Sequence, residues 1–169
     1  MQSNFKKIIT VLFLLIVLCS CGEVGRQKAD PNERYIYMIE TLQEHELFAD
    51  TSSYFDISAD MAKIEGGYRY YITIDNPRQA MYDVELLAIE RGVNYLNNMA
   101  ANVGIFEETE YNMIPNQSNP EKGYVKGIVA SGTSAYPETM LYVFVQFKNA
   151  DHTIAHHEYY RLDVKYEGQ

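Results

Sequence analysis

Residues 141–148, Leu-Tyr-Val-Phe-Val-Gln-Phe-Lys, have the clearest strand pattern of the chain. Two sets of side chains alternate along it: Leu141, Val143, Val145 and Phe147 on one face, and Tyr142, Phe144, Gln146 and Lys148 on the other. A period of two predicts a β-strand. The segment Asn-Ala-Asp-His at 149–152 then turns the chain, and Tyr160, Leu162 and Val164 resume the alternation. We therefore predict a β-hairpin near the end of the chain.

Shorter stretches of the same kind occupy much of the chain before this hairpin. Residues 68–75 alternate until Asn76 and Pro77, where a strand must break because proline cannot donate to a ladder. Residues 82–88 alternate as well, but Leu87 and Ile89 are apolar on the opposite face, so we expect the second half of this strand to be covered on both sides. Two further strands are expected at 53–59 and 124–130, and a loop at 131–137. Residues 106–113 could form another strand, after a loop or a helical turn at 93–101.

One helix is predicted ahead of the strands, over residues 31–46. Asp30 suits the N-cap position, Pro31 suits the first turn, and Glu33 can complete a capping box. Four apolar residues then recur at helical spacing on one stripe: Tyr35, Met38, Ile39 and Leu42. We expect this stripe to pack on the protein's own sheet, and docking onto a partner is the alternative.

About seven strands without alternating helices predict a mainly β fold, with a β-sandwich favoured over an open barrel. The pair of stretches 71–76 and 82–86 resembles paired strands of immunoglobulin-like domains in small bacterial lipoproteins. That resemblance implies an immunoglobulin-like β-sandwich with one N-terminal amphipathic helix over residues 30–169. It carries no functional residues with it.

The N-terminus has the three parts of an export signal. Lys6 and Lys7 precede an apolar run from Ile8 to Cys19 that is interrupted only by Thr10, and this run is too short to cross ~30 Å of hydrocarbon. The sequence Leu18-Cys19-Ser20-Cys21 that follows resembles the lipobox of bacterial lipoproteins. The resemblance implies that residues 1–20 are a signal peptide that is removed, and that the thiol of Cys21 carries a diacylglycerol. An ordinary secretory signal and an uncleaved anchor are the alternatives.

A lipid on Cys21 would place the protein at the extracytoplasmic face of a cell membrane. Residues 21–29 are then a lipidated tether, since 22–29 are polar and without a periodic pattern, and eight extended residues reach ~26–29 Å. Cys21 would be the last cysteine of the mature chain. We therefore expect neither an internal disulfide nor a cysteine-based metal site.

The charge of the chain argues against nucleic acid as a partner. The formal net charge is −9, and removal of Lys6 and Lys7 with the signal leaves 12 basic and 23 acidic side chains, or −11. Nucleic-acid binding relies on clustered Lys and Arg that contact phosphates, and this sequence has no such run.

Two groups of side chains are candidates for a site. His152, His156 and Glu158 are of the types that hold a divalent metal, and 156 and 158 share one face of a strand. Surface histidines on an exposed hairpin are the favoured interpretation. Tyr71 and Tyr159 are candidates for an aromatic binding surface, although alternation should turn about half of the neighbouring tyrosines inward.

These observations favour a binding module over an enzyme. The sequence contains neither a Gly-x-Ser-x-Gly nucleophile motif nor a phosphate-binding glycine loop, and nothing in it calls for a cofactor. We expect an envelope protein that binds another protein or an extracellular ligand through its sandwich. A metal-dependent hydrolase built on His152, His156 and Glu158 is one alternative, and an immunity-type lipoprotein is another.

Overall fold

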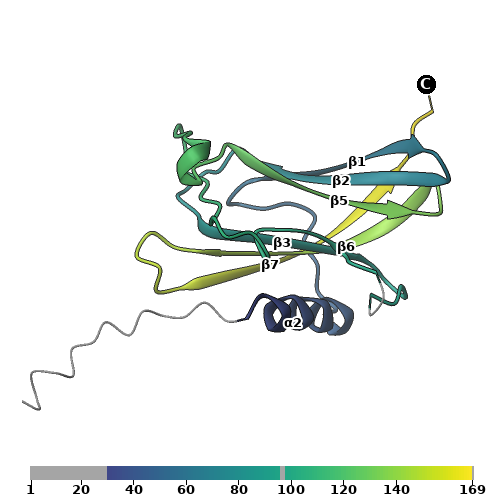
Figure 1. Cartoon of the computed structure of the whole chain (residues 1–169), viewed down its shortest axis with the longest axis horizontal. Coiled ribbons are helices and arrows are strands. Elements are labelled where there is room, and N and C mark those ends of the chain that lie inside the picture. Colours follow the sequence, from purple (N-terminus) through teal and green to yellow (C-terminus); the bar gives the residue numbers. More distant parts are fainter. Residues whose placement is uncertain (1–29, 96–97, 169) are drawn as a thin grey trace, which may run out of the picture.

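In a computed structural model that describes residues 30–95 and 98–168, the chain forms a two-layer β-sandwich covered by one helix (Figure 1). One sheet has three strands in the order β1-β2-β5, the other has four in the order β4-β3-β6-β7, and all neighbours are antiparallel. The elements are α2 (Pro31–Glu44), β1 (Asp56–Ile64), β2 (Gly67–Asp75), β3 (Tyr82–Glu90), β4 (Ala101–Val103), the 3-10 turn η1 (Pro120–Lys122), β5 (Gly127–Ser134), β6 (Glu138–Lys148) and β7 (Ala155–Lys165). The predicted mainly β sandwich with an N-terminal helix is confirmed.

The main core lies between the two sheets and is built by the alternation that the sequence displays. In β2 the inward side chains Tyr70, Ile72 and Ile74 are almost wholly buried. Val143 and Val145 of β6 face them from the other sheet and belong to the same core. Burial of this apolar surface is the main favourable contribution to folding, since each fully buried aliphatic side chain contributes ~1.5–3 kcal/mol.

The predicted C-terminal hairpin is confirmed as β6 and β7. Eleven residue pairs align, with Leu141 opposite Leu162 and Val145 opposite Glu158. The turn between the strands is closed by the amide of Asn149, which donates to the carbonyl of Ile154 at 3.1 Å. The predicted break after β2 is confirmed too, because Asn76 adopts the left-handed conformation with φ 47°.

A second core lies between α2 and the outer face of the four-stranded sheet. Met38 and Leu42 are 1% and 0% exposed, and they pack with outward side chains of β3 and β6, among them Leu87 and Phe144. This explains why the second half of β3 is buried on both faces, as its sequence predicted; the first half, with Asp83 and Glu85, is buried on both faces too, which was not predicted. The predicted stripe and its packing on the protein's own sheet are therefore confirmed.

The ends of α2 follow from local hydrogen bonds. Asp30 accepts a hydrogen bond from the amide of Asn32 at 2.8 Å and is the predicted N-cap. The helix ends at Glu44, two residues before the predicted end, because His45 adopts an extended conformation as the C-cap. The chain then runs along the open edge of β7, where the amide of Ala49 donates to the carbonyl of Tyr159 at 2.9 Å.

Three strand predictions were wrong in position. The strand predicted at 106–113 is replaced by β4 at 101–103, which forms one edge of the four-stranded sheet. Within 106–113, Met113 makes only an isolated bridge to Met81. Gly104, with φ 87°, turns the chain away after β4, and a Cβ there would lie 2.2 Å from the carbonyl oxygen of Val84. The first strand begins at Asp56 and runs on to Ile64, beyond the predicted 53–59.

The third displacement concerns β5, which occupies 127–134 where a strand at 124–130 and a loop at 131–137 were predicted. Ser131 and Ser134 pair with Tyr71 and Tyr68 of β2, so the ladder continues through these small polar residues. The alternation of apolar and polar side chains in β5 is hard to recognise in the sequence, because Gly132 has no side chain. A Cβ at Gly132 would lie 2.3 Å from the hydroxyl oxygen of Tyr70, so the glycine makes room for that ring.

Candidate functional site

The predicted metal ligands lie on the C-terminal hairpin. His156 and Glu158 share the inner face of β7, as predicted, but the ring of His156 stacks on Phe147 with 4.9 Å between centroids. Glu158 accepts a hydrogen bond from the hydroxyl of Tyr160 at 2.9 Å. Among the residues that the structure describes, no group of three or more His, Cys, Asp or Glu side chains is placed to hold a metal ion.

His152 lies apart from these two residues in the turn of the hairpin. It has a positive φ of 57°, and its ring lies 4.7 Å from the ring of Tyr82. The metal site stays a prediction.

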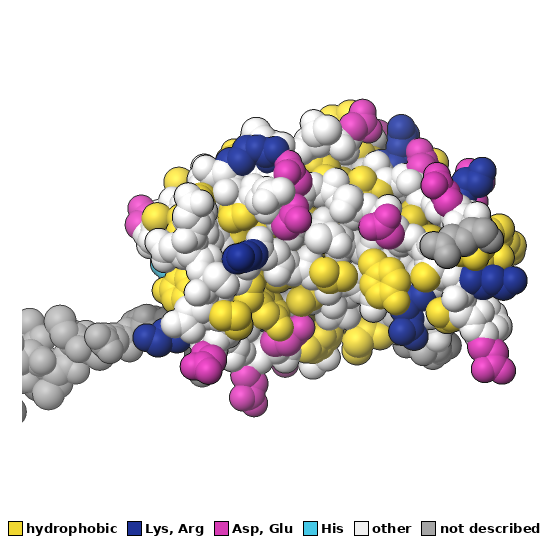
Figure 2. All heavy atoms as spheres, turned by 90° about the horizontal axis from the view of Figure 1, so that it is seen from above, with side chains coloured by type: hydrophobic (Ala, Val, Ile, Leu, Met, Phe, Trp, Pro, Cys, Tyr) yellow, Lys and Arg dark blue, Asp and Glu magenta, His cyan; other side chains and the backbone are white. Residues whose placement is uncertain are grey.

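The two tyrosines predicted to form an aromatic surface lie on opposite layers. Tyr71 is on the outer face of the three-stranded sheet, between Asp60 and Ser131, and Figure 2 shows acidic and basic side chains interspersed with hydrophobic ones on that face. Tyr159 is on the side of the four-stranded sheet that α2 covers, where its ring stacks on His45 at 3.8 Å. The structure does not bring these two rings together into one surface.

Cys21, the signal peptide and the tether lie outside the described residues. Within the described ranges, no helix has the length and apolar character needed to cross a membrane.

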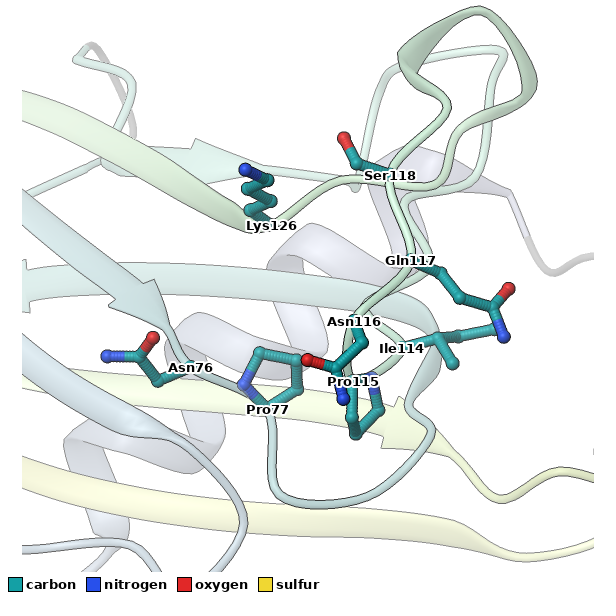
Figure 3. Close-up of a pocket in the computed structure, with 8 residues that line it drawn as sticks. All are labelled: Asn76, Pro77, Ile114, Pro115, Asn116, Gln117, Ser118 and Lys126. Carbon is teal, nitrogen blue, oxygen red and sulfur yellow. The ribbon is translucent and has the colours of Figure 1, made fainter.

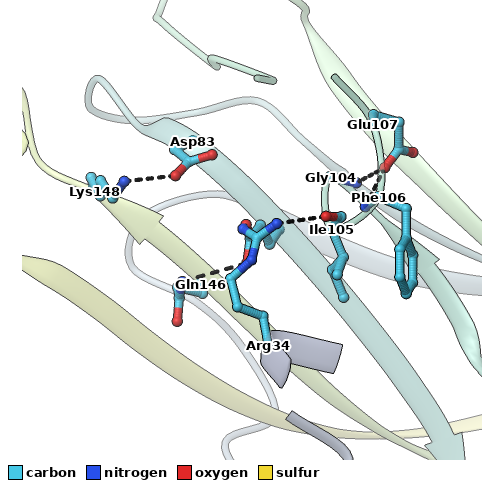
Figure 4. Close-up of polar contacts among 9 residues, drawn as sticks. Arg34, Asp83, Gly104, Ile105, Phe106, Glu107, Gln146 and Lys148 are labelled. Carbon is cyan, nitrogen blue, oxygen red and sulfur yellow. Dashed lines mark hydrogen bonds and ion pairs between the residues drawn. The ribbon is translucent and has the colours of Figure 1, made fainter. Parts of the chain in front are cut away.

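A buried polar layer beneath α2 was not predicted (Figure 4). The guanidinium of Arg34 pairs with the carboxylate of Glu85, whose side chain is 1% exposed, and its Nη2 donates to the carbonyl oxygen of Ile105 at 2.6 Å. Next to this pair, Lys148 donates to Asp83 at 2.7 Å. The sequence placed Asp83 and Glu85 on the polar face of their strand. The helix covers that face, so each carboxylate needs a cationic partner.

A polar hollow opens at the end of the sandwich where β2 ends (Figure 3). We call it the loop-end hollow; its volume is about 490 Å³, and it is lined by Asn76, Pro77, residues 114–118 and Lys126. Asn76 is fixed at its rim, since its amide donates to Asp56 at 2.9 Å. The side chains of residues 116–118 and of Lys126 are exposed. This hollow can contact a polar ligand, but the side chains that would bind it are exposed to solvent, as on an open surface.

A more enclosed cavity lies at the opposite end, where β3 and β5 end, and we call it the tyrosine cavity. It also measures about 490 Å³, and its lining includes Tyr70, Glu90, Tyr95, Ser134 and Tyr136. Such a volume is in the range of small-molecule sites. The residues come from β2, β3, β5 and two connections, so the sandwich itself fixes their relative positions.

Tyr70 is the most informative residue of this cavity. It is 2% exposed, and its ring passes across Gly132, where no side chain blocks it. Across the described residues, its hydroxyl makes no hydrogen bond, and its oxygen is not one of the fully enclosed polar atoms, so it is open to the cavity that Tyr70 lines. A ligand in the cavity can therefore form a hydrogen bond with it.

Glu90 supplies the charge of the cavity. Its Oε2 accepts hydrogen bonds from Thr139 at 2.7 Å and from Ser134 at 3.2 Å, both neutral hydroxyls. No Lys, Arg or His of the described part of the chain pairs with this half-buried carboxylate. The amide of Glu90 donates to the hydroxyl of Tyr95 at 2.7 Å, which holds that ring beside the carboxylate.

The surroundings keep both tyrosines neutral at physiological pH. Burial, with Tyr95 and Glu90 nearby, raises the pKa of Tyr70 well above its usual value of 10. Burial also raises the pKa of Tyr95 to about 12, and the charge of Glu90 acts in the same direction. The carboxylate is thus the charged group in a cavity of neutral hydroxyls and aromatic rings.

The alternation of residues 68–75 predicted one inward face for β2, but it could not identify the cavity, because the lining residues are as far apart along the chain as Tyr70 and Tyr136. Comparison with protein-family models gives no match, and neither does comparison with curated proteins. One solved structure, described as the X-ray structure of Northeast Structural Genomics Consortium target SoR45, is 13% identical with a TM-score of 0.40. The match covers 68% of this chain and 87% of that one. A similarity at this level assigns neither a family nor a function.

Proposed function

We propose that this chain is a lipoprotein held by Cys21 at the extracytoplasmic face of a membrane, and that its sandwich is a binding module with the tyrosine cavity as its ligand site. The observation that carries the binding site is the carboxylate of Glu90, which lines the cavity without a cationic partner in the described chain, together with Tyr70, whose hydroxyl makes no hydrogen bond there. A few polar groups that converge in a cavity lined partly by aromatic side chains are what a ligand-binding site requires.

The position of the cavity relative to the start of α2 supports this proposal. Near the start of the helix Arg34 pairs with Glu85, and near its end the carbonyl oxygen of His45 accepts a hydrogen bond from Arg91 at 2.9 Å, so α2 runs alongside β3 in the same direction. Glu90 is the last residue of β3, whose nine residues span roughly 26 Å. The described domain therefore begins, with α2, at the loop end, whereas the end of β3, where Glu90 lines the cavity, lies at the opposite end of the sandwich; Figure 1 shows α2 running along the sheet. An anchored domain can thus present the cavity away from the membrane.

The proposal includes an immunoglobulin-like sandwich. Three strands in the order β1-β2-β5 face four in the order β4-β3-β6-β7, and the chain passes from one sheet to the other after β2, after β4 and after β5. Such crossings between two antiparallel sheets, in a domain of seven strands, are typical of the immunoglobulin architecture.

The anchor is tested with Cys21→Ala. In cells fed a labelled fatty acid, the wild-type chain should take up label and sediment with membranes, because two or more acyl chains hold a protein stably at a bilayer. The Cys21→Ala chain should carry no label and be recovered in the soluble fraction. Equal membrane recovery and equal processing of the two chains would contradict lipidation. Cys19→Ala is the matched control, and it should keep the label.

The binding site is tested by filling the cavity. The purified chain is incubated with an extract of the envelope and growth medium of its source, and bound compounds are detected by native mass spectrometry. Gly132→Val should abolish binding, because any Cβ at this position enters the space of the Tyr70 ring. Ser131→Val, on the exposed outer face of the same strand, should leave it unchanged. If Gly132→Val proves unstable, Glu90→Gln serves instead. Retention of the compound by both cavity variants would place the site elsewhere.

A further inference from the structure

We infer that the tyrosine cavity binds a small organic cation of the alkylammonium class. This inference rests on the proposed function, since it names the ligand of the same site. It follows from three features of the cavity: an uncompensated carboxylate, a lining of aromatic rings and an unpaired tyrosine hydroxyl.

The carboxylate of Glu90 sets the sign of the ligand's charge. Both of its hydrogen-bond donors, the hydroxyls of Ser134 and Thr139, are neutral, so they orient the carboxylate without balancing its charge. Salt bridges elsewhere in the described chain give its buried carboxylates a cationic partner, as in the pairs of Arg34 with Glu85 and of Lys148 with Asp83. A partly desolvated carboxylate without such a partner disfavours an anion and favours a cation.

The aromatic lining favours an organic cation over a metal ion. Tyr70 and Tyr95 line the cavity as buried and half-buried rings, and Tyr136 and Met99, which are 68% and 71% exposed, complete its lining at the surface. Tyrosine faces carry partial negative charge and attract alkylammonium groups, and cages of such rings recognise methylated ammonium groups in proteins. Glu90 is the only carboxylate in the described lining, which is too few oxygen ligands for Ca²⁺ or Mg²⁺.

The hydroxyl of Tyr70 adds a polar contact that can distinguish among ammonium ligands. Because burial raises the pKa of Tyr70, its oxygen remains protonated and can still accept a hydrogen bond from a primary ammonium. A quaternary ammonium has no N–H and would depend on the rings and on Glu90 alone. The Tyr70 hydroxyl should therefore matter for primary amines and not for tetramethylammonium, which has no hydrogen-bonding group, whereas choline has a hydroxyl that can itself bond to Tyr70.

The experiment is isothermal titration calorimetry of the full lipidated chain in an uncharged maltoside detergent. The probes are choline, propylammonium and the neutral tert-butyl isostere of choline, which has the same shape without the charge. Choline and propylammonium should bind, and the neutral isostere should bind at least about tenfold more weakly, since the interaction depends on charge. Glu90→Gln should weaken both cations by at least about tenfold, the effect expected for loss of a charged partner.

Two further variants separate this explanation from a structural effect. Tyr70→Phe keeps the ring and should weaken propylammonium by roughly fivefold to tenfold while leaving tetramethylammonium, titrated as a fourth probe, nearly unchanged, because only the hydrogen bond is lost. Glu121→Gln, in η1 at the loop end, changes the net charge by the same amount and should alter neither affinity. The thermal unfolding of each variant is recorded alongside, so that a folding defect is recognised.

Binding of the neutral isostere as tightly as choline, or unchanged choline binding to Glu90→Gln, would overturn the inference while leaving the cavity a binding site. Absence of binding by both cations would also overturn it. In that case the proposed function still stands if native mass spectrometry finds another compound whose binding Gly132→Val abolishes. If Gly132→Val abolishes nothing, the proposed function fails as well.

Discussion

Replacement of Arg34 by Met is predicted to destabilise the domain strongly, because it removes one partner of a buried ion pair. The side chain of Glu85 is 1% exposed and that of Arg34 is 14% exposed, so water cannot replace the guanidinium effectively. The carbonyl oxygen of Ile105 loses its donor in the same change. Breaking a buried pair costs ~3–5 kcal/mol, and we expect the lower end because Arg34 is not fully enclosed.

Urea unfolding followed by tyrosine fluorescence measures this effect, since the chain has 15 tyrosines and no tryptophan. A loss of ~3 kcal/mol lowers the unfolding midpoint by roughly 1.5 M, taking a slope of ~2 kcal/mol per M for a domain of this size. Arg69→Met, at an exposed position of β2, is the matched control and should change the stability by no more than ~0.5 kcal/mol.

The double variant Arg34→Met with Glu85→Met decides whether the effect arises from the unpaired charge. Replacing both partners by apolar side chains of similar size leaves no buried charge, so the double variant should lie within ~1 kcal/mol of wild type. If Arg34→Met alone costs less than ~1 kcal/mol, or if the double variant is less stable than the single one, the unpaired charge of Glu85 is not what destabilises the Arg34→Met domain.

Three further predictions concern other parts of the domain. Gly132→Ala should lower the free energy of unfolding by ~1–3 kcal/mol in the same urea assay, because its Cβ would lie 2.3 Å from the hydroxyl oxygen of Tyr70; an effect below ~0.5 kcal/mol would show that the ring moves freely. Asp30→Ala should cost about 1 kcal/mol through loss of the N-cap, whereas Asp30→Asn should cost almost nothing. Burial lowers the pKa of His157 below its ordinary value of 6.5, and His156 adds to the effect. The unfolded chain then binds more protons, so stability should fall as the pH drops below about 6.5, and His157→Gln should reduce that slope; an unchanged slope would contradict this assignment.

The sequence predicted those elements whose side-chain pattern directly reflects burial. The alternation in β2 and β6 and the stripe on α2 each match one buried face, and the apolar residues Leu87 and Ile89 correctly indicated a strand covered on both sides. Short or glycine-containing strands were misplaced for the opposite reason. β4 has three residues, and β5 includes Gly132 and small hydroxyl residues, so neither presents a period that can be recognised.

The polar interactions could be predicted less well, because they depend on which helix residue meets which strand residue. Arg34 precedes Met38 by four positions and therefore continues the buried stripe of α2, a signal that could have indicated a partner for Glu85. The tyrosine cavity has no comparable signal. Glu90 meets Tyr70 and Ser134 only through the pairing of distant strands, and no local spacing relates these positions.

The binding of an organic cation in the tyrosine cavity can be observed at single residues by nuclear magnetic resonance of the chain with isotope-labelled tyrosine rings during a titration with choline. The signals of Tyr70 and Tyr95, which line the cavity, should shift in proportion to occupancy. Those of Tyr71 and Tyr159, on the outer faces of the two sheets, should stay where they are. Shifts confined to Tyr71, Tyr159 or the loop-end residue Tyr124 would contradict the account.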